Sequence, residues 1–166
     1  ALGRRGLPVH LLAVGEGAQR ADIARRLGAR ATLPGAVPQS VLTHVYASAD
    51  IYVFPSETET FGNVVLEAEA SGLPVAVRAG TAPAQMVRAP GIDGLTIASG
   101  EASDWAEALA PLVADAEARR HMGAAARRAV LDHAPDWREV FEADLLSVWE
   151  KMAGRTTDRP EVARAA

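Results

Sequence analysis

Residues 49–79, ADIYVFPSETETFGNVVLEAEASGLPVAVRA, decide the fold of this chain. They begin with Ile51–Phe54, an apolar, β-branched and aromatic run that predicts a strand. A polar loop follows, and a helix is expected to begin at Phe61 or the next residue and to end at Gly72. Val75–Val77 then predicts a second strand. Because such crossover connections are right-handed, the two strands should lie parallel in one sheet.

The amino end of this helix is the predicted binding element. Thr60 is well placed to cap the helix. The free N–H groups of Gly62, Asn63 and Val64 would point out of its positive end, which favours an anion such as a diphosphate by about 0.3–1 kcal/mol, or more if buried. Gly62 also lets a ligand approach the backbone closely.

Two carboxylates flank this helix end. Glu59 lies in the loop and Glu67 lies eight positions later, inside the helix. On one helix this separation would rotate the side chains about 80° apart, so they share a site only if Glu59 precedes the helix. A carboxylate one turn into the helix can accept two hydroxyls of a ribose, and the loop carboxylate can accept hydroxyls of a sugar beyond the phosphates. The alternative is that both are solvated surface acids, as we interpret Glu57 and Glu69.

At these residues the sequence resembles the family 4 retaining glycosyltransferases. Glu59-Thr-Phe-Gly-Asn-Val-Val-Leu-Glu67, followed by Ala-x-Ala-Ser-Gly-Leu-Pro-Val, is similar to their E-x7-E signature. The resemblance implies an α/β fold, a Rossmann-like parallel sheet with helices on both faces, as in the C-terminal half of a GT-B enzyme. It implies that Glu59 acts near the reacting carbon of the transferred sugar and that Glu67 holds the ribose of the donor. The other donor-binding residues of this segment would be Phe61, Gly62, Asn63 and Val64.

A second glycine-containing turn lies near the start of the chain. Val9–Val14 predicts a strand of a sheet covered on both faces, and Gln19–Leu27 predicts a helix. The glycines Gly15 and Gly17 between them suggest a dinucleotide site, but Arg20 stands where the third glycine of G-x-G-x-x-G belongs. In the resembled family a similar turn closes the second strand of the nucleotide-binding half, which makes both glycines donor-binding candidates.

Residues 32–37 predict a short third strand that ends in a turn, and Gln39–Ser48 predicts a helix. Resembled enzymes often read G-x-V at this turn, with the nucleobase against the backbone beside the valine. Val37 is therefore a candidate base contact, with ordinary packing as the equal alternative. Tyr46 lies on the helix without an assigned role.

The remainder predicts a final short strand and a run of helices. Residues 94–98 follow a turn and read as a strand. The periodicity then predicts three helices, the last of them capped by Asp136, and a charged, alanine-rich tail expected to be disordered. The helices are expected over 104–114, 116–133 and 137–152. We therefore expect a donor-binding domain over 1–152 and a disordered tail over 153–166.

Part of the family pattern is absent. In the stretch that follows Val75–Val77, Thr81 stands for a glycine and Gln85 for an acid, and one residue is inserted. The G-R-x-x-x-x-K type segment that neutralises the donor diphosphate is missing, as is the N-terminal half that supplies the acceptor pocket. We therefore expect a piece of a longer polypeptide, inactive alone, with a missing strand between those at Val9–Val14 and Ile51–Phe54.

Composition excludes other classes. The 17 basic and 21 acidic residues give a formal charge of −4, which offers no support for nucleic-acid binding. There is no cysteine, which is compatible with a cytoplasmic protein, and no apolar run of about 18 residues that predicts a membrane span. Any peripheral contact with the inner face of the membrane would be made by the missing N-terminal half. No ligand cluster indicates a metal, so no metal and no cofactor are expected.

The favoured function is donor binding in a retaining glycosyltransferase. Such an enzyme transfers a hexose from a UDP- or GDP-linked sugar to the hydroxyl of a glycan, lipid or small molecule. The alternative is a non-catalytic nucleotide-sugar-binding or regulatory module of the same ancestry, which the missing basic segment favours if the chain is complete. A nicotinamide-dependent oxidoreductase is disfavoured by the broken glycine pattern.

Overall fold

A computed structural model describes residues 1–133 and 141–152 of the chain. Two compact units are distinguished, residues 1–132 and 133–166. The strands of the first unit are β1 (Leu11–Val14), β2 (Ala31–Gly35), β3 (Tyr52–Phe54), β4 (Val75–Arg78) and β5 (Gly94–Ile97). Its helices are α1 (Arg20–Leu27), α2 (Gln39–Ala47), α3 (Asn63–Ala70), α4 (Ala102–Ala114) and α5 (Ala116–His133), with short 3-10 turns at Leu2–Arg5, Gly28–Arg30 and Ala82–Gln85.

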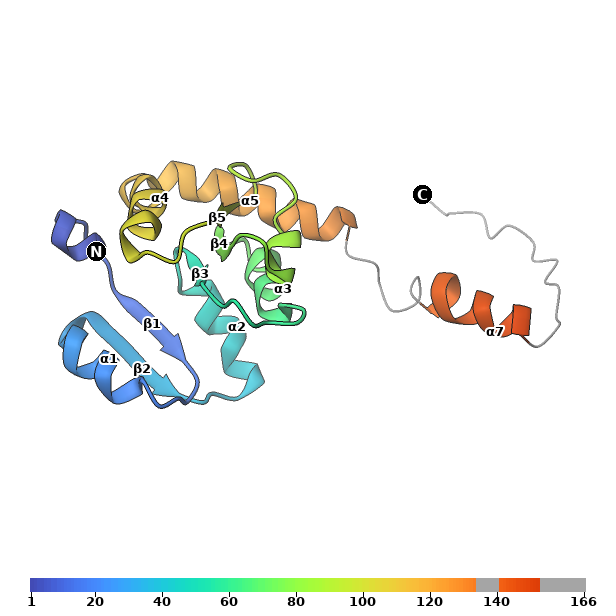
Figure 1. The fold of residues 1–166 in the computed structure, drawn as a ribbon, viewed down its shortest axis with the longest axis horizontal. Coiled ribbons are helices and arrows are strands. Elements are labelled where there is room, and N and C mark those ends of the chain that lie inside the picture. The colour runs from blue at the N-terminus through green and yellow to red at the C-terminus, as the bar shows by residue number, and fades with distance from the viewer. Residues whose placement is uncertain (134–140, 153–166) are drawn as a thin grey trace. The chain divides into compact units, whose positions relative to one another are not determined.

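The strands form parallel sheets, as expected, and the fold class is confirmed (Figure 1). The order in the larger sheet is β3-β4-β5, so β4 is its central strand. Tyr52 lies opposite Val75, and Val75 lies opposite Gly94 on the other side. The strand, helix and strand of residues 52–78 are therefore the parallel crossover unit that the sequence predicts.

β1 and β2 form a separate two-stranded parallel sheet. The sequence predicts one sheet, and the structure has two among its described residues. Direct pairing of β1 with β3 would have contradicted the expected missing strand between them, and that pairing is not found in the described part of the chain. The missing strand stays a prediction.

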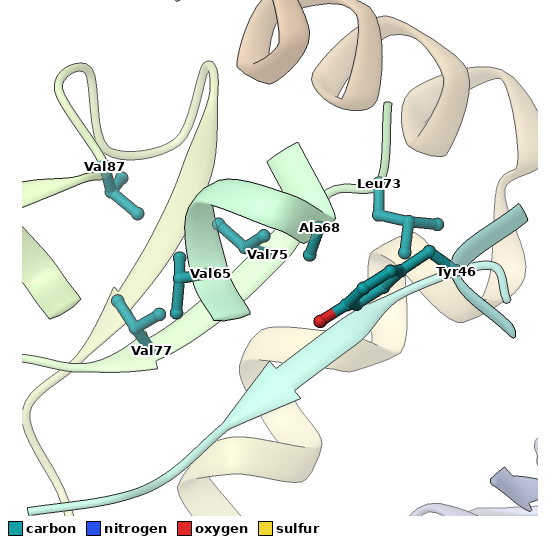
Figure 2. Close-up of a cluster of buried hydrophobic side chains, with 7 residues drawn as sticks. All are labelled: Tyr46, Val65, Ala68, Leu73, Val75, Val77 and Val87. Carbon is teal, nitrogen blue, oxygen red and sulfur yellow. The ribbon is translucent and has the colours of Figure 1, made fainter. Parts of the chain in front are cut away.

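One face of the larger sheet carries the main hydrophobic cluster (Figure 2). Val75 and Val77 point from β4 into this cluster, where Val65 and Ala68 of α3 meet them. Tyr46 of α2 completes the cluster from a second helix. The two small and β-branched residues of α3 let that helix lie close to the sheet.

The opposite face of the same sheet is covered by α4. Ala76 points to this side because side chains alternate along a strand. It packs in a cluster with Ile97 of β5 and with Trp105 and Leu109 of α4. With both faces of β4 buried, Val75, Ala76 and Val77 are all inaccessible to solvent, as the continuous apolar run predicts.

α3 begins differently from the expectation. Thr60 was expected to cap the helix, and this is wrong: the cap residue is Gly62, in the left-handed conformation with φ 94°, and no side chain makes the cap hydrogen bond. The polar loop therefore extends two residues further than predicted. This shift leaves Glu59 well outside the helix.

The second unit holds a π-helical segment, Phe141–Leu146, followed by α7 (Ser147–Met152). The sequence predicts one regular helix over 137–152. The structure differs from this prediction at Phe141–Leu146, where the helix is of the π type. The expected cap at Asp136 and the tail at 153–166 lie outside the described residues. Within the described ranges no helix combines the length and apolar character needed to cross a membrane.

Candidate functional site

The carboxyl ends of β3 and β4 meet at one edge of the larger sheet because these strands are parallel. The loop of residues 55–62 leaves β3 at this edge and leads into α3. Residues 79–81 leave β4 beside it and lead into the 3-10 turn Ala82–Gln85. Ligands of open parallel sheets bind at such an edge, where loops rather than strands supply the side chains.

Gly62 is required at the amino end of α3 for two reasons. Its φ of 94° is one that L side chains rarely adopt. A Cβ there would also lie 2.8 Å from Cγ of Pro83 and 3.3 Å from its Cα. The helix end is therefore packed against the turn that follows β4, and the two loops are fixed to one another.

The backbone donors at this helix end fall into two groups. Those of Thr60 and Phe61 donate to Oε1 of Glu59, at 2.9 and 3.3 Å. Those of Gly62, Asn63 and Val64 have no acceptor among the described residues. Three N–H groups at the positive end of a helix are thus available to an anion, with the Glu59 carboxylate adjacent.

Glu67 lies about one turn into α3 and is half-buried. Its Oε2 accepts a hydrogen bond of 3.0 Å from the Tyr46 hydroxyl, which also lies 3.4 Å from the Val64 carbonyl oxygen. The carboxylate is therefore tied to α2 and has a defined position. One partner leaves most of its acceptor sites free for a ligand.

Two tyrosines surround this carboxylate. Their rings meet edge to face, with centroids 5.8 Å apart. Burial raises the pKa of Tyr46 well above its ordinary value, and the hydrogen bond to Glu67 adds to the shift. Burial, with a smaller contribution from the Glu67 charge, raises the pKa of Tyr52 to about 12. Both hydroxyls are therefore protonated at neutral pH, and Tyr46 remains a donor.

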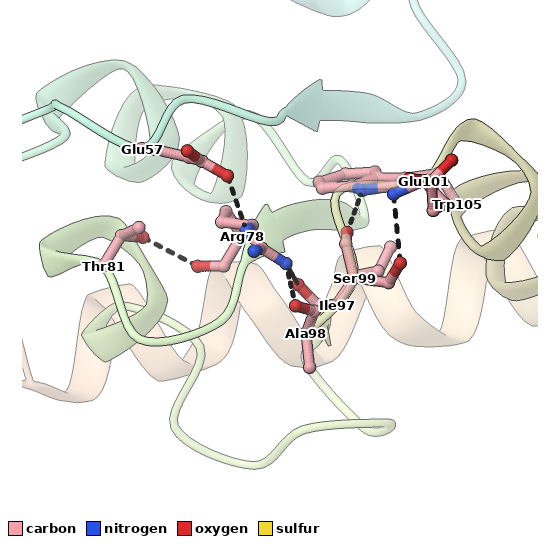
Figure 3. Close-up of polar contacts among 8 residues, drawn as sticks. All are labelled: Glu57, Arg78, Thr81, Ile97, Ala98, Ser99, Glu101 and Trp105. Atoms are coloured by element: carbon pink, nitrogen blue, oxygen red, sulfur yellow. Dashed lines mark hydrogen bonds and ion pairs between the residues drawn. The ribbon is translucent and has the colours of Figure 1, made fainter.

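An arginine ties the loop after β3 to the ends of β4 and β5 (Figure 3). Nε of Arg78 lies 3.1 Å from Oε1 of Glu57. Its Nη1 donates to the carbonyl oxygens of Ile97 and Ala98. Thr81 Oγ1 in turn donates to the Arg78 carbonyl oxygen at 2.7 Å. These contacts order three loops at the edge that carries the candidate site.

The remaining candidates lie at the smaller sheet. The Gly15 N–H donates to the Gly35 carbonyl oxygen at 2.8 Å, which joins the ends of β1 and β2. Gly15 has a φ of 115°, and Gly17 has open space around its Cα. Val37 follows β2 and is half-buried. The structure thus places all three after the carboxyl ends of these strands, and their donor-binding roles stay predictions.

The prediction for the two other acids is partly wrong. Glu57 is exposed, as expected, but forms the ion pair with Arg78. Glu69 is 2% exposed, because it faces the interior beneath α3 rather than solvent. Burial and the nearby Asp93 carboxylate raise the pKa of Glu69 to about 7, which Arg88 partly opposes.

Two residues near the site had no assigned role, Tyr46 and Arg78. A tyrosine on a helix gives no sequence signal of its contact with a carboxylate 21 positions later. Arg78 did carry a signal: a charged residue at the end of a buried apolar strand marks where the strand gives way to a surface loop, and such loops often carry functional residues.

A hollow also lies at the opposite edge of the larger sheet, lined in part by Asp50, Pro74 and Arg119. Arg119 is paired there with Asp50 at 3.4 Å and donates to two carbonyl oxygens of α4. Its charge is satisfied within the fold. This hollow is separate from the amino end of α3 and is not a candidate for the chemistry.

Relatives of known activity resemble this chain over part of their length. It is 38% identical over 128 residues to the sulfoquinovosyl transferase of Arabidopsis thaliana, an alignment that covers 75% of the chain and 25% of that relative. It is 36% identical over 149 residues to the D-inositol 3-phosphate glycosyltransferase of Nocardia farcinica, covering 85% and 33%. The chain therefore spans about a quarter to a third of these relatives.

Solved structures agree on the fold. The sucrose-phosphate synthase from Thermosynechococcus elongatus superposes with a TM-score of 0.75 at 27% identity, over 87% of this chain and 39% of that one. The Anabaena protein HepE, solved in complex with UDP and glucose, gives a TM-score of 0.70 at 20% identity, over 90% and 42%. The second likeness concerns the fold alone.

The family profile described as "Glycosyl transferases group 1" matches residues 2–115. This range contains both sheets, the amino end of α3 and every candidate site residue. Together with the sugar transferases among its relatives, the match shows that the chain belongs to the group 1 glycosyltransferases, with the Rossmann-like fold of GT-B enzymes.

Proposed function

We propose that the chain is the donor-binding part of a retaining glycosyltransferase, which transfers a hexose from a nucleotide diphosphate sugar to an acceptor hydroxyl. The observation that carries the proposal is the amino end of α3. Three backbone N–H groups there lack an acceptor among the described residues, and the acids Glu59 and Glu67 lie before and after them. This is the pattern that a ligand with sugars on both sides of two phosphates requires.

The phosphates would lie on the N–H groups of Gly62, Asn63 and Val64. Charge develops on the diphosphate as the glycosidic bond breaks, and oriented backbone donors stabilise that charge without reorganising. Glu67 would accept the ribose hydroxyls, and Glu59 would accept hydroxyls of the transferred sugar and orient it. Glu59 would then exchange its present hydrogen bonds to Thr60 and Phe61, in part, for bonds to the sugar.

The nucleotide half of the ligand would extend toward the smaller sheet. Gly15 and Gly17 would let the donor approach the backbone, and Val37 would contact the base. A UDP-linked donor is supported by the complexes of HepE with UDP and UDP-glucose, and a GDP-linked donor is the alternative. The proposal needs no metal ion, because the helix end and basic groups of the rest of the enzyme supply the positive charge.

The family's E-x7-E signature supports this division of roles. The acceptor pocket and the basic pair that neutralises the diphosphate are assigned to a longer polypeptide, in keeping with the fraction of the relatives that the chain covers. A cytoplasmic location, or one at the inner face of the membrane, would suit such an enzyme. Sugar transfer would therefore require more than this chain.

Titration calorimetry with UDP, GDP, ADP and NAD tests donor binding by the chain. UDP or GDP should bind with the lowest Kd, and NAD should give no heat. Failure of all three nucleoside diphosphates to bind would contradict the proposal. In a longer polypeptide that includes an acceptor-binding half, NMR of the product should show the anomeric configuration of the donor sugar. A product with the opposite anomeric configuration would contradict the retaining mechanism.

A second candidate is a nucleotide-sugar-binding or regulatory module without catalysis. The G-R-x-x-x-x-K type segment is absent from this chain, and its absence from the longer polypeptide as well would favour this second function. Both functions predict nucleotide binding at α3. They differ in turnover, which a longer polypeptide incubated with UDP-glucose and assayed for released UDP would reveal.

A further inference from the structure

Tyr46 contacts the candidate site from outside the segment that forms it. The residue lies near the end of α2 and is 7% exposed. Its ring belongs to the main hydrophobic cluster, against α3 and β4, and its hydroxyl points toward α3 (Figure 2). The acceptor is Oε2 of Glu67, at 3.0 Å. A rigid aromatic ring thus presents one donor to the carboxylate expected to bind the ribose.

We propose that Tyr46 is a positioning residue for donor binding: its hydroxyl holds the Glu67 carboxylate in the orientation that receives the ribose hydroxyls. The inference rests on the proposed function, since it deepens the role given to Glu67. Tyr46 does not touch the donor itself. It acts by fixing a side chain that would otherwise sample several rotamers at the surface of α3.

The geometry favours positioning over simple core packing. A carboxylate offers about four acceptor sites, and the Tyr46 bond occupies one of them, on Oε2. The remaining sites can accept both hydroxyls of a ribose. Packing alone would not need the hydroxyl, because phenylalanine has the same ring and would bury the same apolar area. The hydroxyl is therefore the part of Tyr46 that the site uses.

The neighbouring Tyr52 provides a matched control. It packs against the same hydrophobic cluster from β3, with its ring centroid 5.8 Å from that of Tyr46, and is half-buried. No hydrogen bond joins its hydroxyl to Glu67 among the described residues. Tyr52→Phe therefore removes a nearby phenol oxygen and leaves the Tyr46 contact in place.

The test is titration calorimetry of the chain and its variants with UDP, GDP and pyrophosphate. For the better of the two nucleotides, Tyr46→Phe should raise the Kd about fivefold to tenfold, because an untethered Glu67 carboxylate would hold the binding orientation only part of the time. Its affinity for pyrophosphate should change by less than about twofold, because the phosphates bind at the helix end. Tyr52→Phe should change neither Kd by more than about twofold. Circular dichroism establishes that each variant is folded.

A double-mutant cycle separates positioning from a general loss of stability. In a Glu67→Ala background, Tyr46→Phe should have no further effect on nucleotide affinity, because the side chain that it positions is gone. Equal nucleotide affinity of Tyr46→Phe and wild type would overturn the inference. So would the same loss in both backgrounds, a parallel loss for pyrophosphate, or an equal loss in Tyr52→Phe. If wild type binds neither nucleotide, the proposed function fails, which is a distinguishable result.

Discussion

The two sheets of this chain differ in how they are covered. In the larger sheet, β4 is buried on both faces, and α2, α3 and α4 supply the packing partners. In the smaller sheet, Leu11 and Val14 of β1 are exposed, and only Gly35 is buried among the residues of β1 and β2. The acids of the candidate site are carried by the well-packed sheet. The carboxylates of the candidate site are thus held by a dense core, which the smaller sheet lacks.

The largest expected effect comes from a glycine behind the larger sheet. A Cβ on Gly123 of α5 would lie 2.0 Å from the Gly72 carbonyl oxygen, and 3.3 Å from Pro74, just before β4. Since backbone must move, Gly123→Ala should lower the free energy of unfolding by about 3 kcal/mol in urea denaturation. The matched variant at the smaller sheet is Gly17→Ala, where nothing lies within 4 Å. It should change stability by no more than about 0.5 kcal/mol.

Equal losses of stability in these two glycine variants would show that the packing behind β4 is not specific. A loss of unfolding free energy in Gly17→Ala alone would show that the smaller sheet is the more tightly packed of the two.

A core deletion tests the same difference through side chains. Val77 has no solvent exposure, whereas Leu11 is 40% exposed. Val77→Ala should cost about 2 kcal/mol of unfolding free energy, from lost apolar burial and the cavity left behind. Leu11→Ala should cost less than about 1 kcal/mol although it removes a larger side chain. A Leu11→Ala variant that is the less stable of the two would show that the smaller sheet is covered in solution.

Glu69, the buried acid of α3, should make the folding stability of the chain depend on pH. The pKa of Glu69 is raised from an ordinary 4.5 to about 7, by burial and by Asp93, against the opposing Arg88. Below about pH 4.5 the group is protonated in both states and imposes no penalty. As pH rises through 7, the unfolded state has already lost the proton that the folded state retains, so stability falls.

Glu69→Gln should therefore be more stable than wild type at about pH 8, by on the order of 1–2 kcal/mol, and the difference should vanish near about pH 4. Thermal melts across this range measure it. Glu16→Gln, at a side chain 67% exposed beside the smaller sheet, is the control and should follow the wild-type profile. A Glu69→Gln profile parallel to wild type would contradict the assignment of the buried acid.

Much of the larger sheet was predictable because its signals are local. The apolar runs at 51–54 and 75–77, and the glycine and proline at Gly72 and Pro74, mark a parallel crossover unit by composition alone. The capping residue was missed because Thr60 satisfies the usual preference, while Pro83 and the left-handed backbone select Gly62 instead. That choice depends on a contact between loops distant in sequence.

Long-range contacts also explain what the sequence left undetermined at the site. Glu69 and Glu67 belong to one helix and differ by two positions, which turns one toward the interior and the other toward Tyr46. Helical periodicity predicts that the two acids lie on different faces of α3, but it does not predict which residues they contact. The Arg78 contact with Glu57 depends likewise on the parallel register of β3 with β4.

In the proposed function, Glu67 binds the nucleotide of a donor whose phosphates lie on the amino end of α3. Titration calorimetry with UDP and GDP, comparing wild type with Glu67→Ala, measures this contribution. Glu107→Ala, at an exposed acid on α4, is the control. The loss of charged hydrogen bonds predicts about 2 kcal/mol, or an affinity about thirtyfold weaker, in Glu67→Ala alone. Unchanged nucleotide affinity in Glu67→Ala, or an equal loss in Glu107→Ala, would contradict the claim.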